Sequence, residues 1–172
     1  MRLGLVLAPH PLPNTSRTAI LEQVVAFGQR AESLGFAGLW MQDSLARGQP
    51  TTDPLVFLAG LCGTTKTIEL GTCVLQVPLR NAMELAHRAQ SLHLLSGGRF
   101  TFGVGSGSTR ADFDAVGVDY DARFKTMTAS LEVMRRGWRG ESATGPALSV
   151  WPGTGASCWQ TSTPICARTR HL

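Results

Sequence analysis

Charged residues and long apolar runs are both scarce in this sequence, and each shortage excludes a class of protein. Only 16% of the 172 residues are charged and 43% are hydrophobic, a composition too apolar for a disordered chain. The longest apolar run, residues 54–62, is far shorter than the ~20 residues of a membrane-spanning helix. The 19 glycines follow no three-residue period, which excludes a collagen-like chain. The sequence therefore predicts a folded domain without a membrane partner.

Signatures of metal-binding, nucleic-acid-binding and secreted proteins are also missing. The four cysteines, at positions 62, 73, 158 and 166, form no Cys-x-x-Cys pair, so a reducing compartment is expected and a zinc site is not. The net charge of +4 comes from mostly scattered basic residues, without the interleaved aromatics of a nucleic-acid-binding surface. Residues 3–8 are apolar, but polar and proline-rich sequence follows them, unlike a secretory signal. We expect a cytoplasmic protein with no nucleic-acid partner and no metal.

Short apolar runs alternate with amphipathic stretches from the start of the chain to about residue 139. Strands are predicted at residues 3–7, 38–41, 68–75 and 100–105. Helices are predicted to end at Gly35, to span 54–63 and 81–95, and to begin at about residue 121. This alternation is typical of strand-helix units on a parallel sheet. The sequence therefore predicts an α/β protein with four βα units in residues 1–145, followed by an irregular tail in residues 146–172.

Two of the predicted helices carry a long apolar stripe that should face the core. The stripe of the first helix contains Ile20, Val24, Phe27, Ala31 and Leu34. The stripe of the last helix contains Phe124, Met127, Leu131, Met134 and Trp138. Chain length leaves two α/β folds open, because a closed eight-stranded barrel takes ~250 residues and a doubly wound sheet of five or six strands takes ~150. Length alone favours the smaller fold.

Candidate ligand-binding residues follow the predicted strands, at the end where parallel-sheet enzymes place their working groups. Asp43 follows the second strand and could orient a ligand, accept a proton or cap the next loop. Thr72, Cys73 and Val74 lie in the third strand, where small and apolar residues fit either the floor of a flat ring site or a buried core.

A glycine-rich stretch follows the fourth strand. Gly105, Ser106 and Gly107 belong to the sequence Gly-Val-Gly-Ser-Gly-Ser at 103–108, which permits close approach of a ligand to the backbone. Its spacing matches neither a dinucleotide-binding loop nor a P-loop, and it is not a nucleophile elbow. The stretch is therefore either a ligand-facing strand end or a tight connection.

Three blocks of the chain resemble the bacterial luciferase-like flavin monooxygenases. They are Gly-Phe-Ala-Gly-Leu-Trp at 35–40, Ile-Glu-Leu-Gly-Thr at 68–72 and Leu-Ser-Gly-Gly-Arg-Phe-Thr-Phe-Gly-Val-Gly-Ser-Gly at 95–107. Residues 112–118 and 120–124 are similar to the loop and helix that come next in that family. The Leu-Ser-Gly-Gly-Arg block is the most specific part, and the match covers about residues 1–140.

The resemblance implies a TIM-type (β/α)8 barrel, of which this chain carries about the first four units. It implies a cofactor at the carboxyl ends of the strands, near Asp43, Thr72, Cys73, Val74, Gly105, Ser106 and Gly107. With reduced FMN, supplied by a flavin reductase, family members use dioxygen to oxygenate a small organic substrate. With the deazaflavin coenzyme F420, they transfer a hydride without oxygen chemistry. A third interpretation is a non-catalytic remnant, which is either unfolded in isolation or a half-barrel that pairs into a homodimer to cover its open edges.

The sequence departs from the family pattern in three places. Ser44 stands where many members have a histidine, and His93 stands where the family usually has an aspartate. The resemblance also ends after residue 154, where the composition changes sharply, and we expect a frameshift or premature stop to have produced residues 155–172.

The pair Val74 and Leu75 resembles the place where the family often carries a cis peptide bond.

Overall fold

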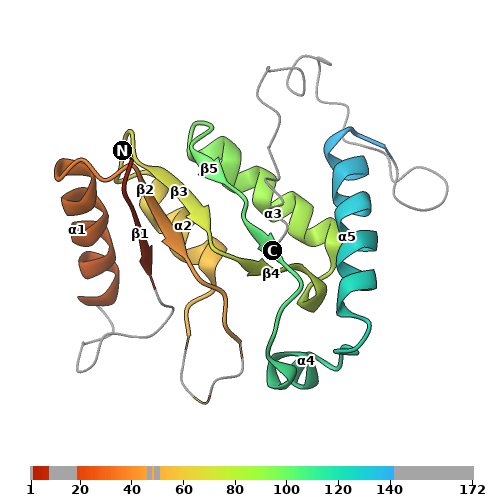
Figure 1. Cartoon of the computed structure of the whole chain (residues 1–172). Helices are drawn as coiled ribbons and strands as arrows, with labels where there is room; N and C mark the ends of the chain where they lie inside the picture. Colours follow the sequence, from red (N-terminus) through yellow and green to blue (C-terminus); the bar gives the residue numbers. More distant parts are fainter. Residues whose placement is uncertain (1, 8–18, 46–47, 49–50, 142–172) are drawn as a thin grey trace.

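The computed structural model describes residues 2–7, 19–45, 48 and 51–141 of the chain (Figure 1). The predicted tail at 146–172 lies outside the described residues. The main sheet is parallel and has the order β1-β2-β3-β5. Its strands are β1 (Gly4–Leu7), β2 (Gly38–Met41), β3 (Glu69–Thr72) and β5 (Phe100–Thr101). A short parallel ladder of β4 (Leu75–Gln76) and β6 (Val104–Gly105) follows β3 and β5, and the sheet is not closed into a barrel in the described part.

Helices connect the strands. They are α1 (Ala19–Ser33), α2 (Pro54–Cys62), the short 3-10 helix η1 (Val77–Leu79), α3 (Ala82–Leu95), α4 (Arg110–Val116) and α5 (Arg123–Trp138). Four of them, α1, α2, α3 and α5, lie where the sequence pattern predicts. The Asp53 carboxylate caps α2 by accepting hydrogen bonds from the two amides Leu55 N and Val56 N, at 2.9 and 3.1 Å. Gly35 follows α1 with a φ of 81°, a conformation that glycine adopts at little cost. None of the described helices is long and apolar enough to cross a membrane.

The hydrophobic core lies between one face of the sheet and the helices α2, α3 and α5. Leu39, Met41 and Leu70 project from the strands into this core, together with Leu58 of α2 and Met134 of α5, and all are at most 2% exposed. Because side chains alternate along a strand, the intervening strand residues face the other side of the sheet. Burial of these aliphatic side chains is the main favourable contribution to folding here.

A tryptophan lies across three glycines on the opposite face of the sheet. A Cβ atom placed on Gly4, Gly38 or Gly71 would be 2.8, 2.9 or 2.4 Å from the Trp40 indole. The three glycines sit on β1, β2 and β3, so the flat ring packs directly against the backbone of neighbouring strands. Val6 on the same face is 53% exposed, which shows that this face is incompletely covered.

Two predicted strands are interrupted where they approach each other. The predicted strand at 68–75 divides into β3 and β4, and the one at 100–105 divides into β5 and β6. At the break the Gly103 carbonyl accepts hydrogen bonds from Thr72 Oγ1 and Leu75 N, at 2.7 and 2.9 Å, in place of a regular ladder. The peptide bond between Cys73 and Val74 is cis, one residue earlier than the Val74–Leu75 position that the resemblance indicated.

The predictions for the helices also needed corrections. Residues 110–116, predicted as loop, form α4, which is only seven residues long and therefore too short to show a clear helical period. Phe124, predicted to face the core, is 62% exposed and lies beneath the guanidinium of Arg123. Phe27 and Leu34 of the predicted α1 stripe, also expected to face the core, are 40% and 57% exposed.

Candidate functional site

A buried ion pair holds the carboxyl ends of β2 and β4 together. Arg80 Nη1 and Nη2 donate to Asp43 Oδ2 and Oδ1 at 2.6 and 2.9 Å, a bidentate arrangement that combines charge with directed hydrogen bonds. The Asp43 side chain is 1% exposed and the Arg80 side chain is 15% exposed. The backbone amide of Gln76 also donates to Asp43 Oδ2, at 2.8 Å. Asp43 thus anchors the segment at 76–80.

Three residues accept hydrogen bonds from the Arg80 guanidinium. Besides Asp43, it donates to the Gln76 carbonyl at 3.2 Å and to Asp53 Oδ2 at 3.5 Å. Burial lowers the pKa of Arg80, but the hydrogen bond and charge of Asp43, assisted by the charge of Asp53, outweigh it, so the pKa is raised. The guanidinium therefore stays charged and links α2 to the end of β4.

Gln76 connects this ion pair to α4. Its Nε2 donates to Asp112 Oδ2 at 3.0 Å and lies 3.4 Å from the Asp43 carbonyl. Both Gln76 and Asp112 are buried, with exposures of 5% and 0%. Sequence reasoning missed Gln76, Arg80 and Asp112 as parts of the site. One available signal was the polar Gln76 inside the apolar run at 74–79, since a buried polar side chain needs partners.

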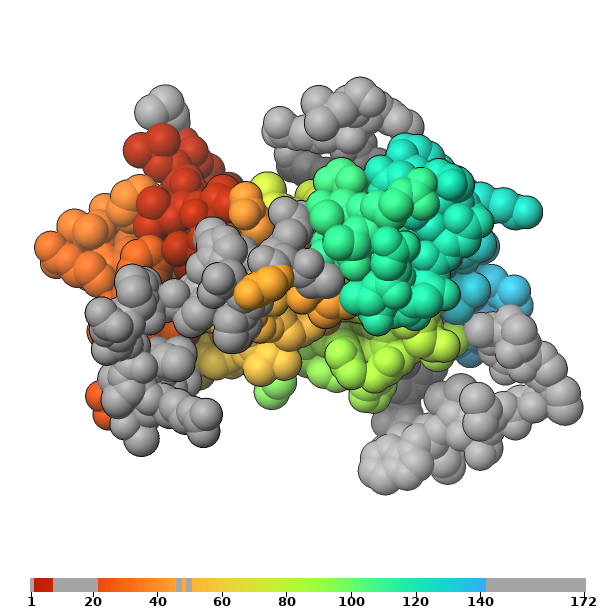
Figure 2. All heavy atoms as spheres, turned by 90° about the horizontal axis from the view of Figure 1, so that it is seen from below, coloured from red at the N-terminus to blue at the C-terminus, as the bar shows by residue number. Residues whose placement is uncertain are grey.

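The residues predicted to floor a ring site differ in how far they are exposed. Thr72 is 1% exposed and its hydroxyl is engaged by Gly103, so it does not present a side chain to a ligand. Cys73 is exposed and Val74 is 45% exposed. A Cβ on Gly105 would lie 2.6 Å from Val74 Cγ2, so these two predicted site residues are in direct contact. Cys73, Val74 and Gly105 form what we call the strand-end platform. The strands of the main sheet point toward the side of the molecule from which Figure 2 is seen.

Close packing also explains why residue 107 of the predicted loop is a glycine. A Cβ on Gly107 would lie 2.7 Å from Gln76 Oε1 and 2.8 Å from the Phe113 ring, and Gly107 has a φ of 82°. Ser106, between the platform and Gly107, is half-buried. The glycine spacing is thus required by the close approach of β6 to β4, whether or not a ligand binds there.

Ser44 contributes an unusual polar atom at the same end of the sheet. Its hydroxyl oxygen is buried and has no hydrogen-bond partner among the described residues, whereas its carbonyl accepts from Thr51 Oγ1 at 2.8 Å. A buried hydroxyl without a partner is costly. In the described part, no group of His, Cys, Asp and Glu side chains is arranged to hold a metal ion.

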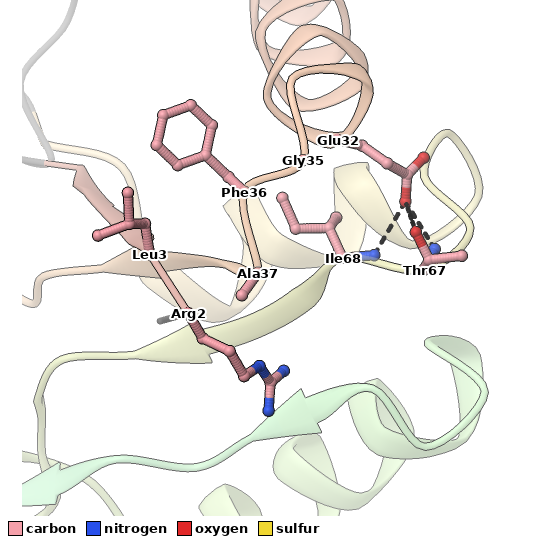
Figure 3. Close-up of a pocket in the computed structure, with 8 residues that line it drawn as sticks. All are labelled: Arg2, Leu3, Glu32, Gly35, Phe36, Ala37, Thr67 and Ile68. Carbon is pink, nitrogen blue, oxygen red and sulfur yellow. Dashed lines mark hydrogen bonds between the residues drawn. The ribbon is translucent and has the colours of Figure 1, made fainter.

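The opposite end of the sheet carries a pocket of about 450 Å³ whose lining includes Glu32 (Figure 3). The Glu32 carboxylate accepts hydrogen bonds from three consecutive amides, Lys66 N, Thr67 N and Ile68 N, with shortest distances of 2.9, 2.6 and 2.9 Å. Burial raises the pKa of Glu32, but these amides lower it more, to about 2. The amides that could bind an external anion are therefore already occupied.

Arg99 closes the same end of the sheet. Its guanidinium donates to four backbone carbonyls and one hydroxyl, at 2.8 to 3.2 Å: Ser96 O, Ile68 O, Cys62 O, Thr65 O and Thr65 Oγ1. The preceding glycines, Gly97 and Gly98, have φ angles of 65° and 83°. The Ser-Gly-Gly-Arg sequence thus forms a structural corner between α3 and β5, far along the strands from the platform.

Comparison with known families agrees with this architecture. The family model described as luciferase-like monooxygenase matches residues 1–165, which extends beyond residue 154, where the resemblance in the sequence analysis ended. The chain is 36% identical over 139 residues to 4-hydroxyprotoasukamycin monooxygenase of Streptomyces nodosus subsp. asukaensis. That alignment covers 77% of this chain and 36% of the relative.

Two solved structures show the same fold at low identity. The oxygenating constituent of 3,6-diketocamphane monooxygenase from Pseudomonas putida, solved in complex with FMN, aligns with a TM-score of 0.73 and 20% identity. It covers 82% of this chain and 40% of the other. The coenzyme F420-dependent tetrahydromethanopterin reductase from Methanopyrus kandleri aligns with a TM-score of 0.64 and 20% identity, covering 89% of this chain and 44% of the other.

These alignments place the described strands in the TIM-barrel fold. The chain spans less than two fifths of the length of the curated relatives it matches first, 36% to 39%. The family match covers more than half of the chain, and the four parallel strands with their crossover helices have the geometry of the relatives' barrels. The chain belongs to the luciferase-like monooxygenase family, whose members are oxidoreductases.

Proposed function

We propose that the described residues form one half of the active site of a flavin-dependent monooxygenase. In this proposal the cofactor is reduced FMN, and dioxygen is used to oxygenate a small organic substrate. The observation that carries it is the strand-end platform, an accessible apolar surface at the carboxyl end of a parallel sheet. The proposal also requires a flavin reductase that supplies the reduced cofactor in the cytoplasm.

The platform suits a flat ring. Val74 presents an apolar side chain that is 45% exposed, and Gly105 beside it has no Cβ to hold a ring away from the backbone. A bound flavin would supply the redox chemistry that the side chains themselves lack. The Ser44 hydroxyl is buried at the same end and has no partner among the residues that the structure describes, so it is suited to donate a hydrogen bond to the ring or to a substrate.

Asp43 has an indirect part in this proposal. Both of its carboxylate oxygens are engaged by Arg80, and one also accepts from Gln76 N. The Asp43 side chain is enclosed, at 1% exposed, so it is better placed to hold β4 in position than to exchange a proton with a ligand. We therefore propose Asp43 as a positioning residue beneath the ring site.

A deazaflavin cofactor is the second candidate. The fold similarity to the F420-dependent reductase favours it, because the described strands align with that enzyme over 44% of its length. In this case the substrate would exchange a hydride with coenzyme F420, and dioxygen would have no part. The platform suits the two ring systems equally, so a direct comparison of binding is required.

Binding of the two cofactors to the purified chain tests the proposal. FMN fluorescence, reduced FMN as an anaerobic competitor, and coenzyme F420 are the probes. The test variant is Val74→Asp, and the matched control is Val56→Asp, since Val56 on α2 is also exposed, at 67%. We expect Val74→Asp to weaken FMN binding about tenfold or more through the lost apolar contact, and Val56→Asp to leave it unchanged.

The outcomes separate the candidates. Tighter binding of F420 than of FMN would replace the first candidate by the second. Equal loss in the two variants would contradict the platform as the ring site. No affinity for either cofactor at millimolar concentration would contradict both candidates for this chain and support the non-catalytic half-barrel.

A further inference from the structure

The backbone of Gln76 links the buried ion pair to the strand-end platform. In the short β4–β6 ladder the partner of Gln76 is Gly105, one of the three residues of the platform. The Gln76 amide donates to Asp43 Oδ2 at 2.8 Å. The end of β2 and a residue of the proposed ring site are therefore joined through one residue of β4.

The side chain of Gln76 makes a second set of contacts, toward α4. Its Nε2 donates to Asp112 Oδ2 at 3.0 Å and to the Asp43 carbonyl at 3.4 Å. Gln76 and Asp112 are both buried, at 5% and 0% exposed. Because water is largely excluded from both side chains, the loss of this hydrogen bond would leave buried polar groups without a replacement partner from solvent.

The contacts of Gln76 with Gly105 and with Asp112 close a loop. Gly105 ends β6 and Asp112 lies in the first turn of α4, so residues 106–111 leave Gln76 at one end and return to it at the other. Within this segment Gly107 has a φ of 82°, and a Cβ there would lie 2.7 Å from Gln76 Oε1. The segment therefore bends closely around the Gln76 side chain, and we call residues 106–111 the clasped loop.

Aromatic side chains also hold the clasped loop. Tyr120 Oη donates to the Ser108 carbonyl at 3.2 Å, and the Tyr120 ring meets Phe113 edge-on, with 5.2 Å between ring centroids. Phe113 is 0% exposed, and its ring would lie 2.8 Å from a Cβ at Gly107. A loop that is already held in this way loses little conformational entropy when a ligand binds beside it.

We propose that Gln76 is a positioning residue for the ring site, because it holds Gly105 and the clasped loop in one arrangement. This inference rests on the proposed function, since the platform that Gln76 positions is the proposed cofactor site. Gln76 itself does not contact the cofactor in this proposal. It acts through Gly105, with which it pairs, and through Asp112, whose helix it holds. Without the Gln76 amide the loop would sample several conformations, and cofactor binding would have to order it again.

Hydrogen exchange of the full 172-residue chain, without any cofactor, tests the hold on the loop. Gln76→Leu replaces the amide by an apolar group. We expect the backbone amides of residues 106–112 to exchange about tenfold faster in this variant than in wild type, and those of α3 to remain unchanged. The matched control is Gln29→Leu, which removes an exposed glutamine whose Nε2 donates to the Thr64 carbonyl at 3.3 Å. The control should leave exchange in the loop unchanged.

A swap of the two polar groups separates the hydrogen bond from a simple loss of packing. Gln76→Glu alone places a second carboxyl group beside Asp112 and should release the loop at neutral pH. Combined with Asp112→Asn, it restores one amide and one carboxylate, with the donor now on α4. Exchange of residues 106–112 in the double variant should return to within about threefold of wild type.

Cofactor binding separates this proposal from the proposed function. Where wild type binds FMN or coenzyme F420, Gln76→Leu should weaken that binding about tenfold, and the swapped double variant should recover it. Loop exchange that is unchanged in Gln76→Leu, or that rises equally in α3, would overturn the proposal, and so would a cofactor affinity that is the same in all variants. A wild type that binds neither cofactor, with a loop that Gln76→Leu releases, would contradict the proposed function and not the hold of Gln76 on the loop.

Discussion

Nη1 and Nη2 of Arg80 donate to the two carboxylate oxygens of Asp43, at 2.6 and 2.9 Å. The two residues come from the ends of β2 and η1, 37 positions apart in the chain. Together with the hydrogen bond from Gln76 N to Asp43, this contact ties the segment that follows β4 to the end of β2.

Removing one partner of this ion pair should be strongly destabilising. We expect Arg80→Met to lower the free energy of unfolding by about 3 kcal/mol or more, because the Asp43 carboxylate is left buried without its counter-charge. Urea denaturation measures the loss. The double variant Asp43→Asn with Arg80→Met should lose less than the sum of the single variants. Additive losses would show that the pair is not energetically coupled.

The Glu32 carboxylate should make stability depend on pH in the acid range. Its folded pKa of about 2 lies below its ordinary value of 4.5, so its contribution is complete above about pH 4.5 and is lost as the pH falls through about 2. Glu32→Gln should therefore be less stable than wild type at neutral pH, and the difference should shrink between these limits. Glu22→Gln, on an exposed position of the same helix, is the control. A difference that is constant with pH would contradict the role of the amide contacts.

A methyl group at position 103 should disrupt the break between the β3–β5 strand pair and the β4–β6 strand pair. A Cβ there would lie 2.0 Å from the Thr72 carbonyl oxygen, which is backbone and cannot turn aside. We expect Gly103→Ala to cost more than about 3 kcal/mol of stability or to abolish soluble expression. At Gly63 a Cβ meets nothing within 4 Å, so Gly63→Ala should change stability by less than about 1 kcal/mol. Equal stability of the two variants would refute the close contact.

The stability of the corner between α3 and β5 should require arginine, and not lysine, at position 99. Lysine keeps the charge but cannot reach the five acceptors that the planar guanidinium spans, so we expect Arg99→Lys to lose about 2 to 3 kcal/mol. Thermal denaturation and urea denaturation should agree on the loss. Arg88→Lys changes an exposed arginine paired with Glu84 and should be neutral within about 0.5 kcal/mol. A neutral Arg99→Lys would mean that the corner is held by the glycine turn alone.

The fold was more predictable than the site because its signals are local. Asp53 before Pro54 and Gly35 after an apolar stripe mark helix ends within a few residues, and the structure confirms both. The contacts of the site join distant segments instead: Gln76 reaches Asp112 across 36 positions and Asp43 reaches Arg80 across 37. No local pattern encodes such a pairing. The broken strands were missed for the same reason, since the interruption at Gly103 depends on its approach to Thr72.

The Ser-Gly-Gly-Arg corner bears on how such chains are classified. This block was the most specific part of the resemblance, yet its side chains bind backbone carbonyls at the end of the sheet opposite the platform. A sequence can therefore keep this signature intact while every residue that would meet a cofactor changes. Searches that depend on the block will therefore collect proteins that share an architecture, and the ring site proposed at positions 44, 74 and 105 has to be tested separately.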